Sequence, residues 1–383
     1  MFKFSKTGLP LICKAVLTLI AVTTFVISEY AFPGQSLSGE VQIERCWEYP
    51  YDGDSDGELA ADGESVYMVR QGSTIDAVSL EDGKLRWSSD VGGTIASNLV
   101  TFETGLYFVR RTLVADKNKA EPVEIRAISV STGVTKWNVE IADKGPFRLW
   151  PRSGELWAVA ETGSYYAFSA ADGALGQKVD ASIGTPAVID PKDNSVAFVA
   201  GQKEVRYIKD TEARSSLIAE SPFQITAIWT GPGGSIVWGD QRGNLVSFDR
   251  AEGEIVWKFK SGAKITDIAR VNGYLLAASN DDFVYAIGPG SGNRIWKKRL
   301  GGRIQAIDGV GERYVLVSTV GGHNLLLIDA ADGKTAGQVL LDDDGGTVTL
   351  KVISSSSFLV QTPGSLAKYS LTGCNAGKSN GSR

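Results

Sequence analysis

A repeat of about 40 residues constrains this chain more than any other feature of its sequence. Each copy has a short apolar run, a turn that ends in Gly, and a second run that carries a Trp four residues after the Gly. The clear copies end at Trp87, Trp137, Trp257 and Trp296. Self-similarity at this period is typical of architectures in which each repeat buries its apolar faces only against its neighbours.

The glycines of these turns give the number of copies. Successive glycines are separated by 50, 40, 80, 39, 41 and 40 residues. The interval of 80 contains a degenerate copy, with Ala213 half-way where a Gly is expected, and the interval of 50 contains a polar insertion. The sequence therefore predicts eight turns, of which seven carry a Gly: Gly83, Gly133, Gly173, Gly253, Gly292, Gly333 and Gly373.

Each repeat contains four short runs with the character of β-strands. Residues 262–300 show the pattern, in which four runs with β-branched and aromatic residues are separated by Gly, Asn or Asp. Four strands in 40 residues, repeated around a ring, are typical of propeller blades. The sequence predicts an all-β fold, an eight-bladed β-propeller with four-stranded antiparallel blades.

The two ends of the chain complement each other. The last repeat stops after its third strand, and its fourth, Trp-bearing strand is missing. Residues 41–50 read as such a strand, with Trp47 at the position of the repeat's Trp. We expect this N-terminal strand to complete the last blade, because that pairing removes an open edge and closes the ring.

Two cysteines fall where the ends are expected to meet. Cys374 follows the last turn Gly, and Cys46 precedes Trp47. In an oxidising compartment a Cys46–Cys374 disulfide is expected, and loop entropy gives it about 4–5 kcal/mol as an upper figure. The alternative is two unrelated free thiols.

The N-terminus resembles a targeting segment. Three Lys among the first 14 residues precede an uncharged apolar run at 15–27, which is the pattern of a secretory signal peptide. Cleavage is expected after Ser28 or Ala31, and the protein is then periplasmic or otherwise secreted. The alternative is an uncleaved anchor in the inner membrane. No Cys follows a small residue at the end of the apolar run, so no lipid anchor is expected.

The resulting division of the chain has four parts. They are a signal peptide at 1–31, a linker at 32–40, the propeller at 41–374 and a disordered tail at 375–383.

Charge and histidine content exclude several classes of function. The net charge is −5 and no basic cluster occurs, which argues against a nucleic-acid partner. The single histidine, His323, excludes sites with several His ligands and is expected to be a polar turn residue. We expect a monomer without a catalytic site.

The repeated phrase Ala-x-Asp-x-x-Thr/Asp-Gly-x-x-x-Trp resembles the PQQ-type, or tryptophan-docking, repeat, which is similar in kind to WD40 repeats. The resemblance covers residues 41–374. One group with this repeat is the quinoprotein alcohol dehydrogenases, which hold pyrroloquinoline quinone and calcium. Another is the BamB-like proteins, periplasmic propellers in the machinery that assembles outer-membrane β-barrels. Length, signal and blade number look more like the second group.

The resemblance implies a non-catalytic periplasmic scaffold that binds other envelope proteins, including the barrel assembly machinery. The alternative is a quinoprotein-type enzyme or sensor with pyrroloquinoline quinone, a sugar or an alcohol in the central channel. A third interpretation is a cell-surface module of unassigned role. Quinoprotein dehydrogenases usually carry two adjacent cysteines, which this chain lacks, and BamB-like proteins are typically lipoproteins.

The repeat's tryptophans are expected to pack between blades rather than to stack on a cofactor, because they occupy one fixed place in the outer strand. They are Trp47, Trp87, Trp137, Trp257 and Trp296.

Two acidic loops are the remaining candidate sites. Asp52, Asp54 and Asp56 form a D-x-D-x-D-G pattern like the start of a calcium loop, but Gly63 stands where the final bidentate ligand is needed. Calcium is therefore the weaker interpretation and a solvated turn the stronger one. A second run at 342–344 is expected on the same face and forms a candidate acidic patch for a basic partner, or simply a solubilising surface: Asp342, Asp343 and Asp344.

Overall fold

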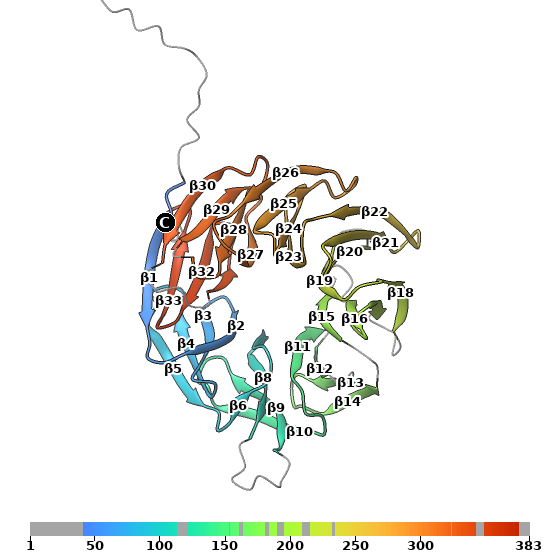
Figure 1. Cartoon of the computed structure of the whole chain (residues 1–383). Helices are drawn as coiled ribbons and strands as arrows, with labels where there is room; N and C mark the ends of the chain where they lie inside the picture. Colours follow the sequence, from blue (N-terminus) through green and yellow to red (C-terminus); the bar gives the residue numbers. More distant parts are fainter. Residues whose placement is uncertain are drawn as a thin grey trace, which may run out of the picture. The chain divides into compact units, whose positions relative to one another are not determined.

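The propeller predicted from the repeat is the fold of the chain. The computed structural model describes residues 41–374 without 113–120, 153, 161–163, 181–183, 190–194, 209–214, 232–233, 323 and 342–347, and without the side chains of 56, 179–180 and 184–189. In this part of the chain, eight antiparallel sheets follow one another around a ring (Figure 1). Among the same residues, none belongs to a helix of the length and apolarity needed to cross a membrane.

The blades are numbered in chain order, and their strands are given from the centre of the ring outwards. Blade 1 contains β2 (Ser55–Ala61), β3 (Ser65–Arg70), β4 (Thr74–Ser79) and β5 (Leu85–Asp90). Blade 2 contains β6 (Thr94–Ile95) and β7 (Val100–Phe102), both paired with β8 (Gly105–Arg111), and then β9 (Val123–Ser129) and β10 (Thr135–Ile141). Blade 3 contains β11 (Phe147–Arg152), β12 (Glu155–Ala160), β13 (Ser164–Ser169) and β14 (Leu175–Asp180). Blade 4 contains β15 (Gly184–Ile189), β16 (Val196–Ala200), β17 (Glu204–Ile208) and β18 (Ser216–Glu220).

The second half of the ring has the same construction. Blade 5 contains β19 (Ile225–Thr230), β20 (Ser235–Asp240), β21 (Asn244–Asp249) and β22 (Glu254–Lys260). Blade 6 contains β23 (Ile265–Val271), β24 (Tyr274–Ser279), β25 (Phe283–Ile287) and β26 (Arg294–Arg299). Blade 7 contains β27 (Ile304–Val310), β28 (Tyr314–Thr319), β29 (Asn324–Asp329) and β30 (Thr335–Leu340). Blade 8 contains β31 (Thr349–Val352), β32 (Ser357–Thr362), β33 (Ser365–Ser370) and β1 (Glu44–Pro50).

The burial of each strand follows from its place in the blade. In β24 (YLLAAS) five of six side chains are buried, because the middle strands lie between two neighbouring blades and both their faces pack against apolar side chains. In the outer strand β22 (EIVWKFK) only Trp257 is buried and the charged side chains lie in solvent. The core is therefore made of a series of apolar layers between successive blades.

The ring closes as the sequence predicts. Strand β1 pairs antiparallel with β33, from Glu44 opposite Ser370 to Pro50 opposite Ser365. The N-terminal strand is thus the outer strand of blade 8, beside the C-terminal end of the propeller (Figure 1). This pairing replaces what would otherwise be two unpaired edges with one complete sheet.

Candidate functional site

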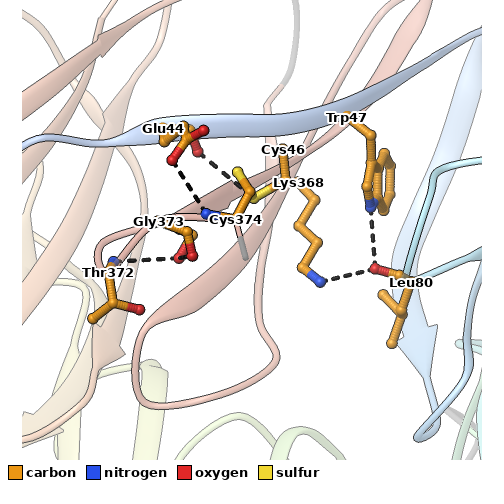
Figure 2. Close-up of a disulfide and its surroundings, with 9 residues drawn as sticks. Glu44, Cys46, Trp47, Leu80, Lys368, Thr372, Gly373 and Cys374 are labelled. Carbon is orange, nitrogen blue, oxygen red and sulfur yellow. Dashed lines mark hydrogen bonds between the residues drawn. A yellow bond between two sulfur atoms is a disulfide. The ribbon is translucent and has the colours of Figure 1, made fainter. Parts of the chain in front are cut away.

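The ring closure is the first site that the sequence predicts. The structure joins Cys46 of β1 to Cys374, just beyond β33, in a disulfide with a Cα–Cα distance of 5.2 Å. Figure 2 shows Glu44 beside it, where its carboxylate accepts the backbone N–H of Cys374 at 3.1 Å. The covalent bond and the hydrogen bond hold the two chain ends at the same point of the blade.

A carbonyl of blade 1 ties the closing blade to its neighbour. The Leu80 carbonyl accepts hydrogen bonds from the Trp47 indole N–H at 3.1 Å and from Lys368 Nζ at 2.8 Å (Figure 2). Burial lowers the pKa of Lys368 below its ordinary value. Both donors come from blade 8, so the last blade is fixed to the first through one turn.

Trp47 illustrates a contact that recurs around the ring. Its indole lies on the Cα of Gly83 in the next blade, where an added Cβ would come within 2.7 Å of the ring. Gly83 also has φ of +71°, a conformation that favours glycine. The turn glycine is therefore required for two reasons, its backbone conformation and the close approach of the indole.

Four further tryptophans make the same contact, each with the turn glycine of the following blade. Each of the five donates its indole N–H to the carbonyl three residues before that glycine, at 2.7–3.1 Å. The further pairs are Trp87 with Gly133, Trp137 with Gly173, Trp257 with Gly292, and Trp296 with Gly333. These tryptophans are thus blade-packing residues in the structure.

The contact between blades 7 and 8 uses a substitute. Gly337 of β30 stands at the Trp position, and the segment before β1 lies against it, with the Val41 carbonyl 2.8 Å from the place of a Cβ. The Val41 N–H also donates to the Ala336 carbonyl at 2.6 Å. Val41 and Ile43 pack on the apolar cluster of these two blades. Only the absence of Trp from β30 hints at this in the sequence.

An ion pair in the centre of the ring was not expected from the sequence. Arg148 of β11 and Glu58 of β2 form two contacts, at 2.5 and 3.1 Å, and so join the inner strands of blades 3 and 1. Blade 2 lies between these blades, and its inner strand is divided into β6 and β7. No local pattern relates two residues that are 90 positions apart.

Two buried carboxyls connect the inner strands of blades 6, 7 and 8. Asp267 accepts backbone N–H groups from Ile268 at 2.8 Å and Ile307 at 3.4 Å. Asp308 repeats this arrangement one blade later, with Val352 as its partner in the next inner strand at 3.4 Å. Burial raises the pKa of Asp267 to about 6 and also raises that of Asp308. A perturbed pKa can indicate a catalytic acid, but the hydrogen-bond partners here are backbone amides, which fits a structural link.

Replacing Asp267 with Asn should change how stability depends on pH. A carboxyl whose pKa is raised on folding favours the fold when protonated, and this contribution is lost as the pH rises from about 4 to about 6. From the shift of Asp267 to about 6, the free energy of unfolding of Asp267→Asn relative to wild type should rise by about 2–3 kcal/mol over this window. Urea unfolding at several pH values measures it. Asp54→Asn, at an exposed turn, is the control, and parallel profiles for wild type and Asp267→Asn would contradict the expectation.

The two acidic loops have different outcomes. Asp52 and Asp54 are exposed, and the Asp54 carbonyl accepts the backbone N–H of Gln71 at 2.8 Å. The side chain of Asp56 lies outside the described part. Within that part, no three His, Cys, Asp or Glu side chains gather as metal ligands. The second acidic run and the single histidine also lie outside the described residues: Asp342, Asp343, Asp344 and His323.

The outer strands offer the most extensive candidate interaction surface. We call the outer strands of the eight blades the rim, and nearly every blade exposes a large apolar side chain on it or beside it. Each of these strands is paired on one side only, so its other edge can accept an added strand. The exposed side chains on or next to the rim are Leu85, Val134, Leu175, Leu217, Ile255, Val256, Ile295 and Leu340.

Two cavities lie beside the rim. The larger, about 450 Å³, lies at the end of blade 2 and has charged walls of both signs, including Arg111, Glu140 and Lys144. The smaller, about 250 Å³, lies against β1 and β33 and is lined by Leu341, Tyr369 and other residues of blade 8. Their mixed linings suit polypeptide contacts as well as small polar ligands.

Comparisons with known proteins agree on the fold. The chain is similar to BamB from Moraxella catarrhalis, with a TM-score of 0.69 at 12% identity over 86% of this chain and 100% of that one. It is similar to the computationally designed Ika8 protein, with a TM-score of 0.67 at 14% identity over 85% and 99%. The quinohemoprotein alcohol dehydrogenase ADHIIG from Pseudomonas putida HK5 gives 0.64 at 11% identity over 88% and 77%. At these identities the likeness shows the fold alone. No curated protein matches the chain.

Sequence comparison adds the family. A family profile described as outer membrane protein assembly factor BamB matches residues 38–259 and 241–377, which together span the propeller. The closing strand, the turn glycines and the docked tryptophans all lie within these ranges. The chain therefore belongs to the family described as outer membrane protein assembly factor BamB.

Proposed function

We propose that this protein is a non-catalytic scaffold of the cell envelope that binds other envelope proteins, as a component of outer-membrane β-barrel assembly. The observation that carries the proposal is the family match over the whole propeller. The structural likeness to BamB, which covers all of that chain, is consistent with it. Because one fold can support many functions, the match is read together with the surface.

The rim supports a binding role. Apolar side chains on an outer strand are about half exposed in several blades, including Leu85, Leu175 and Ile295. Exposed apolar side chains beside unpaired strand edges are typical of surfaces that receive another polypeptide. The rim therefore offers a partner both backbone hydrogen bonds and apolar contacts.

The periplasm is the compartment that we propose. A disulfide that closes the ring suits an oxidising environment, and the N-terminal sequence has the pattern of a signal peptide. Determination of the N-terminus of the protein purified from cells should give Glu29 or Phe32 as the first residue. A protein that retains its first residues and fractionates with the inner membrane would support the anchored alternative.

The partner can be tested by crosslinking the tagged full-length protein in native envelopes and identifying captured proteins by mass spectrometry. We expect enrichment of outer-membrane barrel assembly proteins. The designed Ika8 protein, which has a similar fold, is a suitable bait control because it shares the architecture. Equal recovery with both baits, or no envelope protein with this one, would contradict the proposal.

A quinoprotein-type enzyme or sensor is the second candidate, favoured by the likeness to ADHIIG. The donor groups do not fit such a site well. The chain has no adjacent cysteine pair, and the part described holds no cluster of metal-ligating side chains. Titration of the purified protein with pyrroloquinoline quinone and calcium, followed by absorbance and alcohol oxidation, tests this candidate. Stoichiometric uptake with turnover would replace the scaffold proposal.

A further inference from the structure

One docking position for tryptophan is built but empty among the described residues. The turn between β21 and β22 has the geometry of the occupied turns. Gly253 has φ of +73°, and its N–H donates to the Asp249 carbonyl at 2.9 Å. In the occupied turn of blade 3, Gly173 has φ of +75° and donates to the Ser169 carbonyl at the same distance. Yet a Cβ on Gly253 would meet no described atom within 4 Å.

The reason lies in the preceding blade. In the five blades with a docked Trp, the Trp directly follows a bulged residue of the outer strand, as Trp257 follows Val256. In β18 the bulge falls at Ile218, so that Ala219 follows it and pairs with Val205. Alanine thus stands at the Trp position, and it packs on the apolar cluster between blades 4 and 5. A methyl group is too short to cover Gly253.

The surroundings of this position are apolar and exposed. Leu217 of β18 is 49% exposed, and Ile255 and Val256, which follow Gly253, are 44% and 50% exposed. They are the only adjacent pair among the large apolar side chains exposed in the described part. An apolar patch that surrounds an open glycine face is suited to a buried anchor residue of a partner.

The occupied copies show which chemistry fits. An indole lies flat on the glycine Cα and donates its N–H to the carbonyl three residues earlier in the turn. In blade 5 that carbonyl belongs to Arg250. The chain's own C-terminal tail, residues 375–383, contains no aromatic residue that could serve.

We infer that the face formed by Gly253, Ala219, Leu217, Ile255 and Val256 binds a tryptophan side chain presented by an extended segment of a partner protein. The indole takes the place that Trp137 and its equivalents take elsewhere in the ring, and the segment runs along the free edge of β18. The inference deepens the proposed scaffold function, because it specifies a site and the chemistry of what it binds.

The experiment uses a peptide of the sequence Glu254–Lys260, EIVWKFK, which carries one of the docking tryptophans. Its binding to the full-length protein is measured by calorimetry, beside the same peptide with Trp257→Ala. We expect saturable binding that weakens at least about tenfold without the indole, as for truncation of a buried anchor. Equal binding of both peptides, or of neither, would overturn the inference.

Variants locate the site. Ala219→Trp places the protein's own indole over Gly253 and should abolish peptide binding. Gly253→Asn should weaken it as well, because asparagine tolerates positive φ and its side chain enters the same space. Gln177→Trp, the same type of change at the Trp position of β14, should leave binding intact. Circular dichroism confirms folding, and unchanged binding to both folded site variants would refute the assignment.

The same variants separate this inference from the proposed function. If wild type captures envelope proteins and Ala219→Trp captures them equally, the scaffold function stands and the tryptophan site is wrong. If wild type captures none but still binds the peptide in the expected way, the site stands and the proposed function is wrong.

Discussion

Removal of the Cys46–Cys374 disulfide should lower the stability of the propeller by about 4–5 kcal/mol. The bond joins residues 328 positions apart, so its loss frees nearly the whole unfolded chain, and loop entropy grows with the length of the closed loop. The entropy of unfolding of a domain of this size is about 0.7 kcal/mol per °C. We therefore expect the double variant Cys46→Ser, Cys374→Ser to melt about 6–7 °C below wild type.

Differential scanning calorimetry measures this change. Wild type under reducing conditions should match the double variant, because both lack the same covalent bond. The reductant should leave the melting temperature of the double variant unchanged. If the double variant melts with oxidised wild type, then the β1–β33 pairing and the Trp47 contact close the ring without covalent help.

Replacing Trp137 with Ala should cost about 3–5 kcal/mol, the usual range for truncation of a buried Trp. Trp137 is 9% exposed and lies on Gly173 of the next blade. Its indole N–H donates to the Ala170 carbonyl at 3.1 Å. The truncation leaves a cavity between two blades that are held apart by the rest of the ring, so the structure cannot easily collapse to fill it.

Two further variants separate the parts of this contact. Trp137→Phe keeps an aromatic ring on Gly173 but loses the hydrogen bond, and should cost about 1 kcal/mol. The Ala170 carbonyl would still accept the Tyr107 hydroxyl at 2.9 Å. Gln177→Ala, at the Trp position of the next outer strand, should change stability by less than about 0.5 kcal/mol. Chemical denaturation measures all three, and a loss for Gln177→Ala as large as that for Trp137→Ala would contradict the role of the indole.

The sequence by itself determined the architecture, because its signals are local. Strand alternation, turn glycines and the spacing of the tryptophans repeat within each 40-residue unit, and they predict four strands per blade and eight blades. The missing last strand and the Trp-bearing strand before it in the ring, around Trp47, predict the closure. The two cysteines follow from that closure, since it brings both ends of the chain to one blade.

Only the tertiary structure decided what happens between blades. That Trp137 meets Gly173, that Val41 replaces an absent tryptophan, and that Gly253 is left uncovered all depend on how one blade lies against the next. The bulge at Ile218, which brings Ala219 to the Trp position, shifts the register within β18 and leaves no trace in the spacing of the turns. Likewise, the pairing of Glu58 with Arg148 and the burial of Asp267 arise at the centre of the ring. These contacts join residues tens of positions apart, whose distance is set by the closure of the ring rather than by any local preference of the chain.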